Sequence, residues 1–322
     1  MIEARPEIVG QFHAVLQDNT AGNPMDDEVI WTDLTAADVV KRLAELGTPV
    51  SVHVIEQLFA LEGYGRRQAQ KSCSMGEHPD RNAQFLKIAE LKQEYLDSPN
   101  PVLSIDTKKK ELLGTFYRDG KLFTKKTLGA FDHDFPSFAD GVVIPHGIYD
   151  LKLNRGYLHL GTSRDTSEFA CDALADWWWR FGRDQYSKAT TPLLLCDGGG
   201  SNSSRTYLFK ADLQGLVNRI GLPVRVAHYP PYTSKYNPIE HRLFPHVTRA
   251  CQGVMFKSVA LVKQLMEKTR TRTGLSVVVD ILDRVYETGR KVAEEVKQTL
   301  NILRDPILPL WNYLILPAPK NS

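Results

Sequence analysis

Two aspartates stand directly after short apolar runs of the sequence. Asp106 follows residues 102–105 and Asp197 follows residues 193–196, and both runs have the length and composition of buried strands. In open α/β sheets the functional crevice lies outside the carboxyl ends of the strands, so aspartates placed there are candidates for ligand or catalytic groups. Taken alone, each could equally be an aspartate that caps a turn.

A third acidic residue, Glu240, lies near the start of a predicted helix. Asn237 can cap this helix, Pro238 suits its first position, and Glu240 then occupies the third. The glutamate could complete a capping box at the helix start. Alternatively, the rigid start of the helix directs Glu240 towards the two aspartates.

Three carboxylates on separate elements would suit Mg²⁺, which prefers oxygen ligands and near-octahedral geometry. Two such ions can activate the attacking oxygen and stabilise the leaving oxygen of a phosphodiester. The glycines at 198–200 let the backbone approach a metal or a phosphate closely, but they are part of no Walker motif and no GxGxxG motif. The histidines form no HExxH pattern, so a histidine-based zinc site is not expected.

The sequence after residue 98 predicts the elements that position these carboxylates. We expect strands at 102–105, 157–160, 192–196 and 224–228, helices at 166–181 and 205–220, and a hairpin at 116–123 around Asp119-Gly120. Strands followed by helices predict an α/β domain with a mixed sheet. Trp177, Trp178 and Trp179 are expected to pack in the core rather than to stack on bases, because consecutive helical residues point in different directions.

The sequence before residue 99 predicts a smaller, helical region. A capped helix is expected to begin at Thr35 and a second helix to end near Leu61, with a short glycine-containing turn between them. This pair predicts a helix-turn-helix unit whose second helix enters the major groove of DNA, and a plain helical hairpin is the alternative. The residues that could face bases are Ser51, His53, Glu56 and Gln57.

The composition is that of an ordinary folded protein. The 322 residues are 42% hydrophobic and 24% charged, and the net charge of +2 does not by itself indicate a nucleic-acid partner. No apolar run approaches the roughly 18 residues of a membrane span, and the first ten residues lack the features of a signal peptide. The four cysteines form no CxxC pair, which predicts reduced thiols in a cytoplasmic protein.

Several segments, in this order, resemble one group of bacterial insertion-sequence transposases. They read DTKKKE at 106–111, HDFP at 133–136, DGGGSN at 197–202 and SKYNPIEHRLF at 234–244. HPDRNAQF at 78–85, IPHGIYD at 144–150 and TRTGLSV at 271–277 look like further landmarks of the same group. Over about residues 30–300 the chain is thus similar to the DDE family of Rhodopirellula-type transposases, which is related in outline to Tc1/mariner and integrase enzymes.

The resemblance implies a ribonuclease-H-like core in which Asp106, Asp197 and Glu240 are catalytic and bind Mg²⁺, with Mn²⁺ as a substitute. It implies a DNA transposase that binds double-stranded DNA at the terminal inverted repeats, hydrolyses a phosphodiester there and joins the freed 3′-hydroxyl to target DNA. Cutting two ends favours a homodimer during synapsis. The protein is expected in the cytoplasm, nucleoid-associated when bound to DNA, and on no membrane. The residues then expected to contact phosphates are Lys108, Lys109, Lys110, Lys235 and Arg242.

We therefore expect four regions along the chain. The first is a loosely structured segment at 1–30, and the second is a helical DNA-binding region at 31–98. The second region is expected to contain the helix-turn-helix at 35–63, a linker at 66–80 and a helix at 82–95. The third is a catalytic core at 99–260, and the fourth is a helical region at 261–322. The small amino-terminal domain is expected to be all α.

Members of this family usually begin with a longer amino-terminal region, so an element that helps to recognise transposon ends is expected to be missing or reduced. Two other functions stay open. One is a domesticated protein that binds DNA without catalysis, and the other is a ribonuclease-H-like nuclease without strand transfer.

Overall fold

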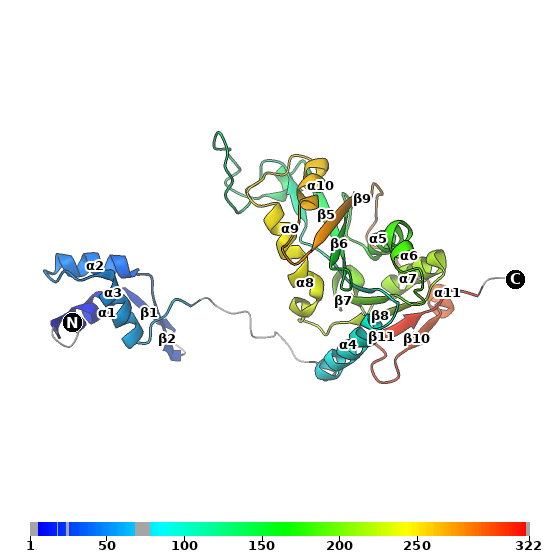
Figure 1. Ribbon diagram of the computed structural model, residues 1–322, viewed down its shortest axis with the longest axis horizontal. Coiled ribbons are helices and arrows are strands. Elements are labelled where there is room, and N and C mark those ends of the chain that lie inside the picture. Colours follow the sequence, from blue (N-terminus) through cyan, green and yellow to red (C-terminus); the bar gives the residue numbers. More distant parts are fainter. Residues whose placement is uncertain (1–5, 18, 24–25, 68–77, 320–322) are drawn as a thin grey trace. The chain divides into compact units, whose positions relative to one another are not determined.

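The computed structural model describes residues 6–17, 19–23, 26–67 and 78–319, and the chain divides into two compact units, residues 1–72 and 73–322 (Figure 1). Cys73 and most of the predicted linker at 66–80 lie outside the described residues. Cys171, Cys196 and Cys251 are buried free thiols. No helix in the described ranges is both long and apolar enough to cross a membrane.

The smaller unit contains helices and a β-hairpin. Its elements are α1 (Glu7–Gln17), β1 (Thr20–Asn23), β2 (Asp26–Thr32), α2 (Ala36–Glu45) and α3 (Val52–Leu61). Ile8 and Phe12 of α1 pack with Leu43 of α2 and Ile55 of α3, and none of the four has exposed surface. The predicted capping box of α2 is confirmed, because Asp38 N donates to Thr35 Oγ1 at 3.2 Å and Thr35 N donates to Asp38 Oδ2 at 2.9 Å.

Two predictions for this unit are wrong where the structure describes it. Residues 1–30 were expected to be loosely structured and the unit to be all α, yet α1 is a three-turn helix and β1 pairs antiparallel with β2, Thr20 opposite Thr32. The apolar spacing of α1 is too short to identify a helix by itself, and the helix is stabilised by its packing on α2 and α3.

A nine-stranded mixed sheet forms the centre of the larger unit and confirms the predicted fold class. Its order is β10-β11-β8-β7-β3-β5-β6-β9, with β4 paired to β5. From β3, the strands β7 and β8 continue in parallel on one side, while β5 is antiparallel on the other and is followed by an antiparallel β6 and then a parallel β9. The bounds are β3 (Val102–Thr107), β4 (Glu111–Leu113), β5 (Gly141–Asp150), β6 (Arg155–Gly161), β7 (Leu193–Cys196), β8 (Val224–His228), β9 (Ser276–Ile281), β10 (Ile302–Arg304) and β11 (Asn312–Ile315).

Helices cover both faces of this sheet (Figure 1). On one face, Leu103 and Ile105 of β3 pack with α5 and α7, and on the other, Leu158 and Leu160 of β6 pack with α8, α9 and α10. The helices are α4 (Arg81–Leu96), α5 (Ser167–Trp177), α6 (Arg183–Gln185), α7 (Tyr207–Ile220), α8 (Pro238–Arg242), α9 (Phe244–Ala250), α10 (Val259–Glu267) and α11 (Glu294–Thr299). Short 3-10 turns lie at η1 (Pro136–Phe138), η3 (Gly200–Asn202) and η4 (Ser234–Tyr236), and a π-helical turn, η2 (Trp178–Gly182), extends α5.

The predicted strands at 102–105, 157–160, 192–196 and 224–228 and the predicted helices are confirmed to within a few residues. The helical prediction for 261–322 is wrong, because β9, β10 and β11 join the sheet there. Helix α4, placed with the DNA-binding region in the sequence, lies in the larger unit and packs Ile88 and Leu91 on Leu193 and Leu195. Trp177 and Trp178 are buried as predicted, whereas Trp179 is exposed.

The hairpin predicted at 116–123 is also wrong, because these residues form no strand. Residues 114–140 form a long connection between β4 and β5 instead. Asp119 O accepts a hydrogen bond from Gly253 N at 2.9 Å, and Gly120 lies against Gln252. The Asp-Gly pair therefore turns against the segment after α9 rather than closing two strands on each other.

Candidate active site

Asp106 and Asp197 lie side by side at one edge of the sheet. In the parallel pairing of β3 and β7, Ile105 is opposite Cys196, so the two aspartates take the next position of adjacent strands. Side chains alternate along a strand, so Asp106 shares a face with Ser104, on the α8 side of the sheet. Both carboxyl groups thus point towards the helix that carries Glu240.

Asn237 joins the elements that carry the three carboxylates. Its side chain is fully buried and its Nδ2 donates to Ile105 O at 3.2 Å and to Asp197 Oδ1 at 3.3 Å. Ser104 Oγ donates to Asn237 Oδ1 and accepts from Ile239 N at 2.9 Å. The predicted side-chain cap by Asn237 is wrong, since its side chain makes no cap hydrogen bond to α8 and turns into the core. The alternative that Glu240 completes a capping box with Asn237 is therefore wrong as well.

Two glycines allow α8 to lie close to the sheet. A Cβ on Gly147 would come within 2.7 Å of both Ile239 Cδ1 and Phe244 Cε1, and one on Gly156 would come within 2.4 Å of a Leu243 methyl group. Gly147 is also the residue of β5 opposite Asp106. The missing side chain therefore makes room for α8 next to the first aspartate.

A buried polar chain supports Asp197 from behind. His228, at the end of β8, has its Nδ1 3.0 Å from Asp197 O and its Nε2 2.9 Å from the hydroxyl of Tyr313 in β11. His228 and Tyr313 have no exposed surface. Burial lowers the pKa of His228 to about 4, so the imidazole is neutral at pH 7 and can donate through one nitrogen and accept through the other.

The electrostatics of the three carboxylates are unusual. Burial, together with the nearby charges of Asp197 and Glu240, raises the pKa of Asp106 to about 8. Burial and the charge of Glu240 raise the pKa of Asp197 to about 6, against the opposing effect of the hydrogen bond from Asn237. None of the ion pairs between described residues includes these three side chains. The site therefore gathers carboxyl groups with no protein cation paired to them.

The carboxylate oxygens here are the ligand type that magnesium prefers. In the described ranges no group of three or more His, Cys, Asp or Glu side chains is arranged to hold a metal ion by itself. Mg²⁺ does not need such a group, because it keeps several waters and is bound by one or two carboxylates together with substrate phosphates. The mutual repulsion that raises the pKa of Asp106 is the repulsion that a divalent cation would relieve.

A second polar chain leads from Asp106 to the loop after β6. Thr107 Oγ1 donates to Asp165 Oδ1 at 3.0 Å and lies 3.2 Å from Nδ1 of the buried His146. Burial lowers the pKa of His146 to about 3, so this ring stays neutral. The contact fixes the loop beside the carboxylates.

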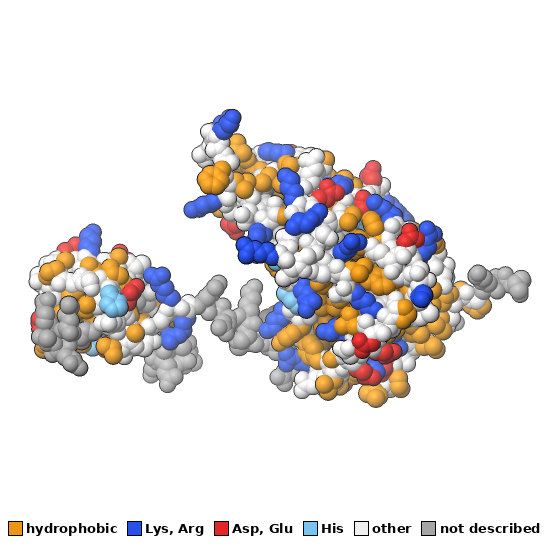
Figure 2. Space-filling view, viewed as in Figure 1, with side chains coloured by type: hydrophobic (Ala, Val, Ile, Leu, Met, Phe, Trp, Pro, Cys, Tyr) orange, Lys and Arg blue, Asp and Glu red, His pale blue; other side chains and the backbone are white. Residues whose placement is uncertain are grey.

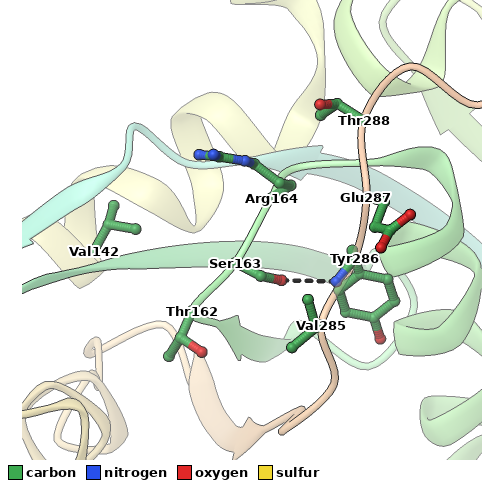
Figure 3. A pocket seen from close by; sticks show the side chains of 8 residues that line it. All are labelled: Val142, Thr162, Ser163, Arg164, Val285, Tyr286, Glu287 and Thr288. Carbon is green, nitrogen blue, oxygen red and sulfur yellow. Dashed lines mark hydrogen bonds between the residues drawn. The ribbon is translucent and has the colours of Figure 1, made fainter.

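The same loop borders a cavity of about 570 Å³ (Figure 3). Thr162 and Arg164 lie on one side and Glu287 and Thr288 on the other, and Ser163 Oγ accepts a hydrogen bond from Tyr286 N at 3.0 Å. The strands β3, β6 and β9 run in the same direction. The cavity therefore lies on the edge of the sheet that carries the carboxylates.

The residues expected to contact DNA differ in how exposed they are. Lys108 is mostly buried in an ion pair with Glu111, which also binds Arg118 at 2.6 Å. Four others, Lys109, Lys110, Lys235 and Arg242, are exposed. Ser51 caps α3 through a bond from Val54 N at 3.4 Å, and His53 and Gln57 are exposed one helical turn apart, 3.2 Å between their side-chain nitrogens.

Sequence reasoning missed Ser104, His228 and Tyr313 as supports of the site. A serine alternating with apolar residues in a buried strand, just before Asp106, was a signal for the first. Nothing in the sequence indicates that β11 lies beside β8, so the contact of His228 with Tyr313 could not be foreseen.

The sheet order β6-β5-β3-β7-β8, with a carboxylate at the end of β3, another after β7 and a third on the helix that follows β8, defines a ribonuclease-H-like α/β core. A family model described as "Rhodopirellula transposase DDE domain" matches residues 11–317. The chain belongs to this transposase family.

The chain has low similarity to solved structures of the Mos1 mariner transposase. The Mos1 paired-end complex with the left transposon end is 13% identical with a TM-score of 0.45, and 81% of this chain and 70% of that chain are covered. The Mos1 strand transfer complex is 14% identical with a TM-score of 0.44, covering 81% and 69%. No curated protein sequence matches the chain.

Proposed function

We propose that the chain is a magnesium-dependent DNA transposase whose catalytic carboxylates are Asp106, Asp197 and Glu240. The observation that carries the proposal is that three elements far apart in sequence bring these three side chains to one edge of the sheet, where the charge of Glu240 adds to the raised pKa of both aspartates. Family membership supplies the reaction class. The adjacent positions of Asp106 and Asp197 at the ends of β3 and β7 support the choice of these residues.

In this proposal Asp106, Asp197 and Glu240 hold Mg²⁺, with Mn²⁺ as a substitute. Bound metal would activate the attacking oxygen and stabilise the leaving oxygen of the phosphodiester. Asn237 keeps Asp197 beside Asp106 through its bonds to Asp197 and to β3. The neutral His228 keeps the backbone of Asp197 fixed, so the oxygen ligands are held in place before DNA arrives.

The smaller unit would bind the terminal inverted repeats of the transposon. Helix α3 presents His53, Glu56 and Gln57 on its exposed side, and such side chains can read base edges in the major groove. Phosphate contacts would set its position and the few base contacts its specificity. Cutting both ends in one event favours a homodimer that holds two DNA ends, and a target duplex would receive the freed 3′-hydroxyls.

The decisive experiment is Mg²⁺-dependent nicking of a terminal-repeat duplex by the wild type and by Asp197→Asn. We expect the wild type to cut and the variant to bind equally well without cutting, because the amide keeps the shape of the side chain but loses the charged metal ligand. Equal cutting by both proteins would show that Asp197 is not catalytic.

The same preparation separates the two other functions. A domesticated DNA-binding protein would shift the duplex in a gel but never nick it in Mg²⁺ or Mn²⁺. A nuclease without strand transfer would leave cut ends unjoined when a target plasmid is supplied. We expect joined products.

A further inference from the structure

A second cavity, of about 390 Å³, lies on the α8 side of the sheet. The residues that give it its chemical character are Asn154, His241, Arg242, His246, Thr271 and Thr273. They come from α8 and α9, from the turn between β5 and β6, and from the loop before β9. Two sequence landmarks that catalysis does not explain, the end of SKYNPIEHRLF and the start of TRTGLSV, meet here.

The lining of this cavity is basic and polar. It contains one guanidinium, two imidazoles and two threonine hydroxyls, and no carboxylate. Arg242 is exposed and takes part in none of the ion pairs or hydrogen bonds between described residues. Figure 2 shows further Lys and Arg side chains over the part of the unit where Figure 1 labels α8 and α9. An anion placed here would meet the guanidinium of Arg242 and several polar donors, and no opposing acid.

The cavity wall is held rigidly by Asn154. This residue has φ 51, a left-handed conformation that non-glycine residues seldom adopt. Its Oδ1 accepts from Tyr149 at 2.9 Å and its Nδ2 donates to Thr273 O at 2.9 Å, which ties the β5–β6 turn to the loop before β9. Thr271 Oγ1 lies 2.9 Å from Thr273 Oγ1. Asparagine adopts this conformation more readily than other non-glycine residues, so the turn is defined by these hydrogen bonds.

The cavity is linked to the carboxylates through α8, although it lies at the other edge of the sheet, where β3 begins and where the β5–β6 turn and the loop before β9 meet. Glu240 and Arg242 belong to the same five-residue helix, α8, and are two positions apart (242 − 240). Residues two positions apart in an α-helix are separated by about 3 Å along the axis and by roughly 200° around it. Arg242 therefore points away from the side on which Glu240 faces the aspartates, within one turn of it.

We propose that this cavity binds a backbone phosphate of the DNA that the carboxylates cut. Arg242 would grip the phosphate through its planar donor pair, with His241, His246 and Thr273 as further donors. The inference rests on the proposed function and adds a positioning contact to it. The contact would fix how far the duplex extends past Glu240, without reading its sequence.

The test uses the full chain and a fluorescein-labelled DNA duplex of mixed sequence, because phosphate contacts do not depend on sequence. Affinity is measured over a range of salt concentrations for the wild type, Arg242→Gln and Thr273→Val. We expect Arg242→Gln to lower affinity about tenfold at low salt and to reduce the slope of log K against log salt by about one. Thr273→Val should weaken binding with the slope unchanged, since no charge is lost.

Arg183→Gln is the matched control. Arg183 is an exposed arginine of α6 with Asp184 beside it and Trp179 under its guanidinium, at the far end of α5. Its removal changes the net charge equally, so the salt slope should stay at the wild-type value. If Arg242→Gln and Arg183→Gln lower the salt slope equally, the change reflects net charge alone and the proposal is overturned.

An unchanged salt slope for Arg242→Gln would also overturn the proposal. So would a variant that keeps its DNA affinity but loses self-association, because the cavity would then bind an acidic segment of a second copy of the chain. Nicking by the wild type and Asp197→Asn is measured in parallel. If the wild type fails to nick, the proposed function fails while the salt slope still tests the phosphate contact. If nicking behaves as expected and the slope does not, only the phosphate site is excluded.

Discussion

At the scale of single residues, the candidate site is a concentration of negative charge. Asp106 and Asp197 are both partly buried, and each has a pKa above that of an ordinary aspartate. The side-chain amide of Asn237 donates a hydrogen bond to Asp197, but no ammonium or guanidinium pairs with this cluster among the described ion pairs. Folding thus brings carboxylates together at a cost that a divalent cation would offset.

This arrangement predicts how stability depends on pH without metal. The pKa of Asp106 is about 8 in the folded protein and about 4 in an unfolded chain. The folded state therefore holds a proton that the unfolded state releases, and the free energy of unfolding falls as the pH rises from about 4 to about 8. Asp106→Asn lacks this titration, so in a chelator it should exceed the wild type in stability by about 1 kcal/mol or more at pH 8, and by much less at pH 4.

Urea unfolding of both proteins at pH 4, 6 and 8 measures this difference. Added Mg²⁺ should raise the stability of the wild type at pH 8 more than that of the variant. A difference between the two proteins that stays constant with pH would mean that Asp106 is not perturbed by its neighbours.

At the scale of elements, the site depends on how closely α8 approaches the sheet. Sequence patterns predicted β3, β7 and β8 well, because short apolar runs bounded by turn residues are typical of buried strands. They also placed Pro238 and Glu240 in a helix. They could not predict that Gly147 and Gly156, on other strands, leave the space for that helix, because this depends on strand pairing across the sheet.

Gly147→Ala tests this dependence. The new methyl group would meet Ile239 and Phe244 at 2.7 Å, so α8 must move away from β5 and carry Glu240 with it. We expect a loss of about 1–3 kcal/mol of stability, as is usual for overpacking, and a fall in the nicking rate with DNA binding retained.

Gly215→Ala is the control for this change. Gly215 lies within α7 and a Cβ there meets nothing within 4 Å, so the substitution should stabilise the protein by about 0.5–1 kcal/mol and leave nicking unchanged. Wild-type nicking by Gly147→Ala would show that the position of α8 is not critical.

At the scale of the whole molecule, the chain is two compact units with separate cores. The boundary differs from the one that the sequence predicted, because the helix at 81–96 reads as a continuation of the preceding helices until its contacts with β3 and β7 are seen. The three strands of the last region were missed because β9, β10 and β11 are short and become stable only by pairing with the sheet.

Residues 73–322 alone should therefore fold. The sheet and both of its helical layers belong to this part, so we expect a single cooperative thermal transition by circular dichroism and a large loss of affinity for terminal-repeat DNA, since α3 is removed. A fragment without a transition would show that the larger unit needs the smaller one to fold.

The position of β11 in the sheet has a consequence for how the protein is made. Tyr313, which contacts His228 behind Asp197, comes 116 positions after Asp197 (313 − 197), and β11 pairs directly with β8. The smaller unit is translated first, yet the support of Asp197 is incomplete until β11 has been translated. Under the proposed function, a gene copy with a stop codon before β11 would yield a protein that occupies transposon ends without cutting them and competes with intact copies in the same cell.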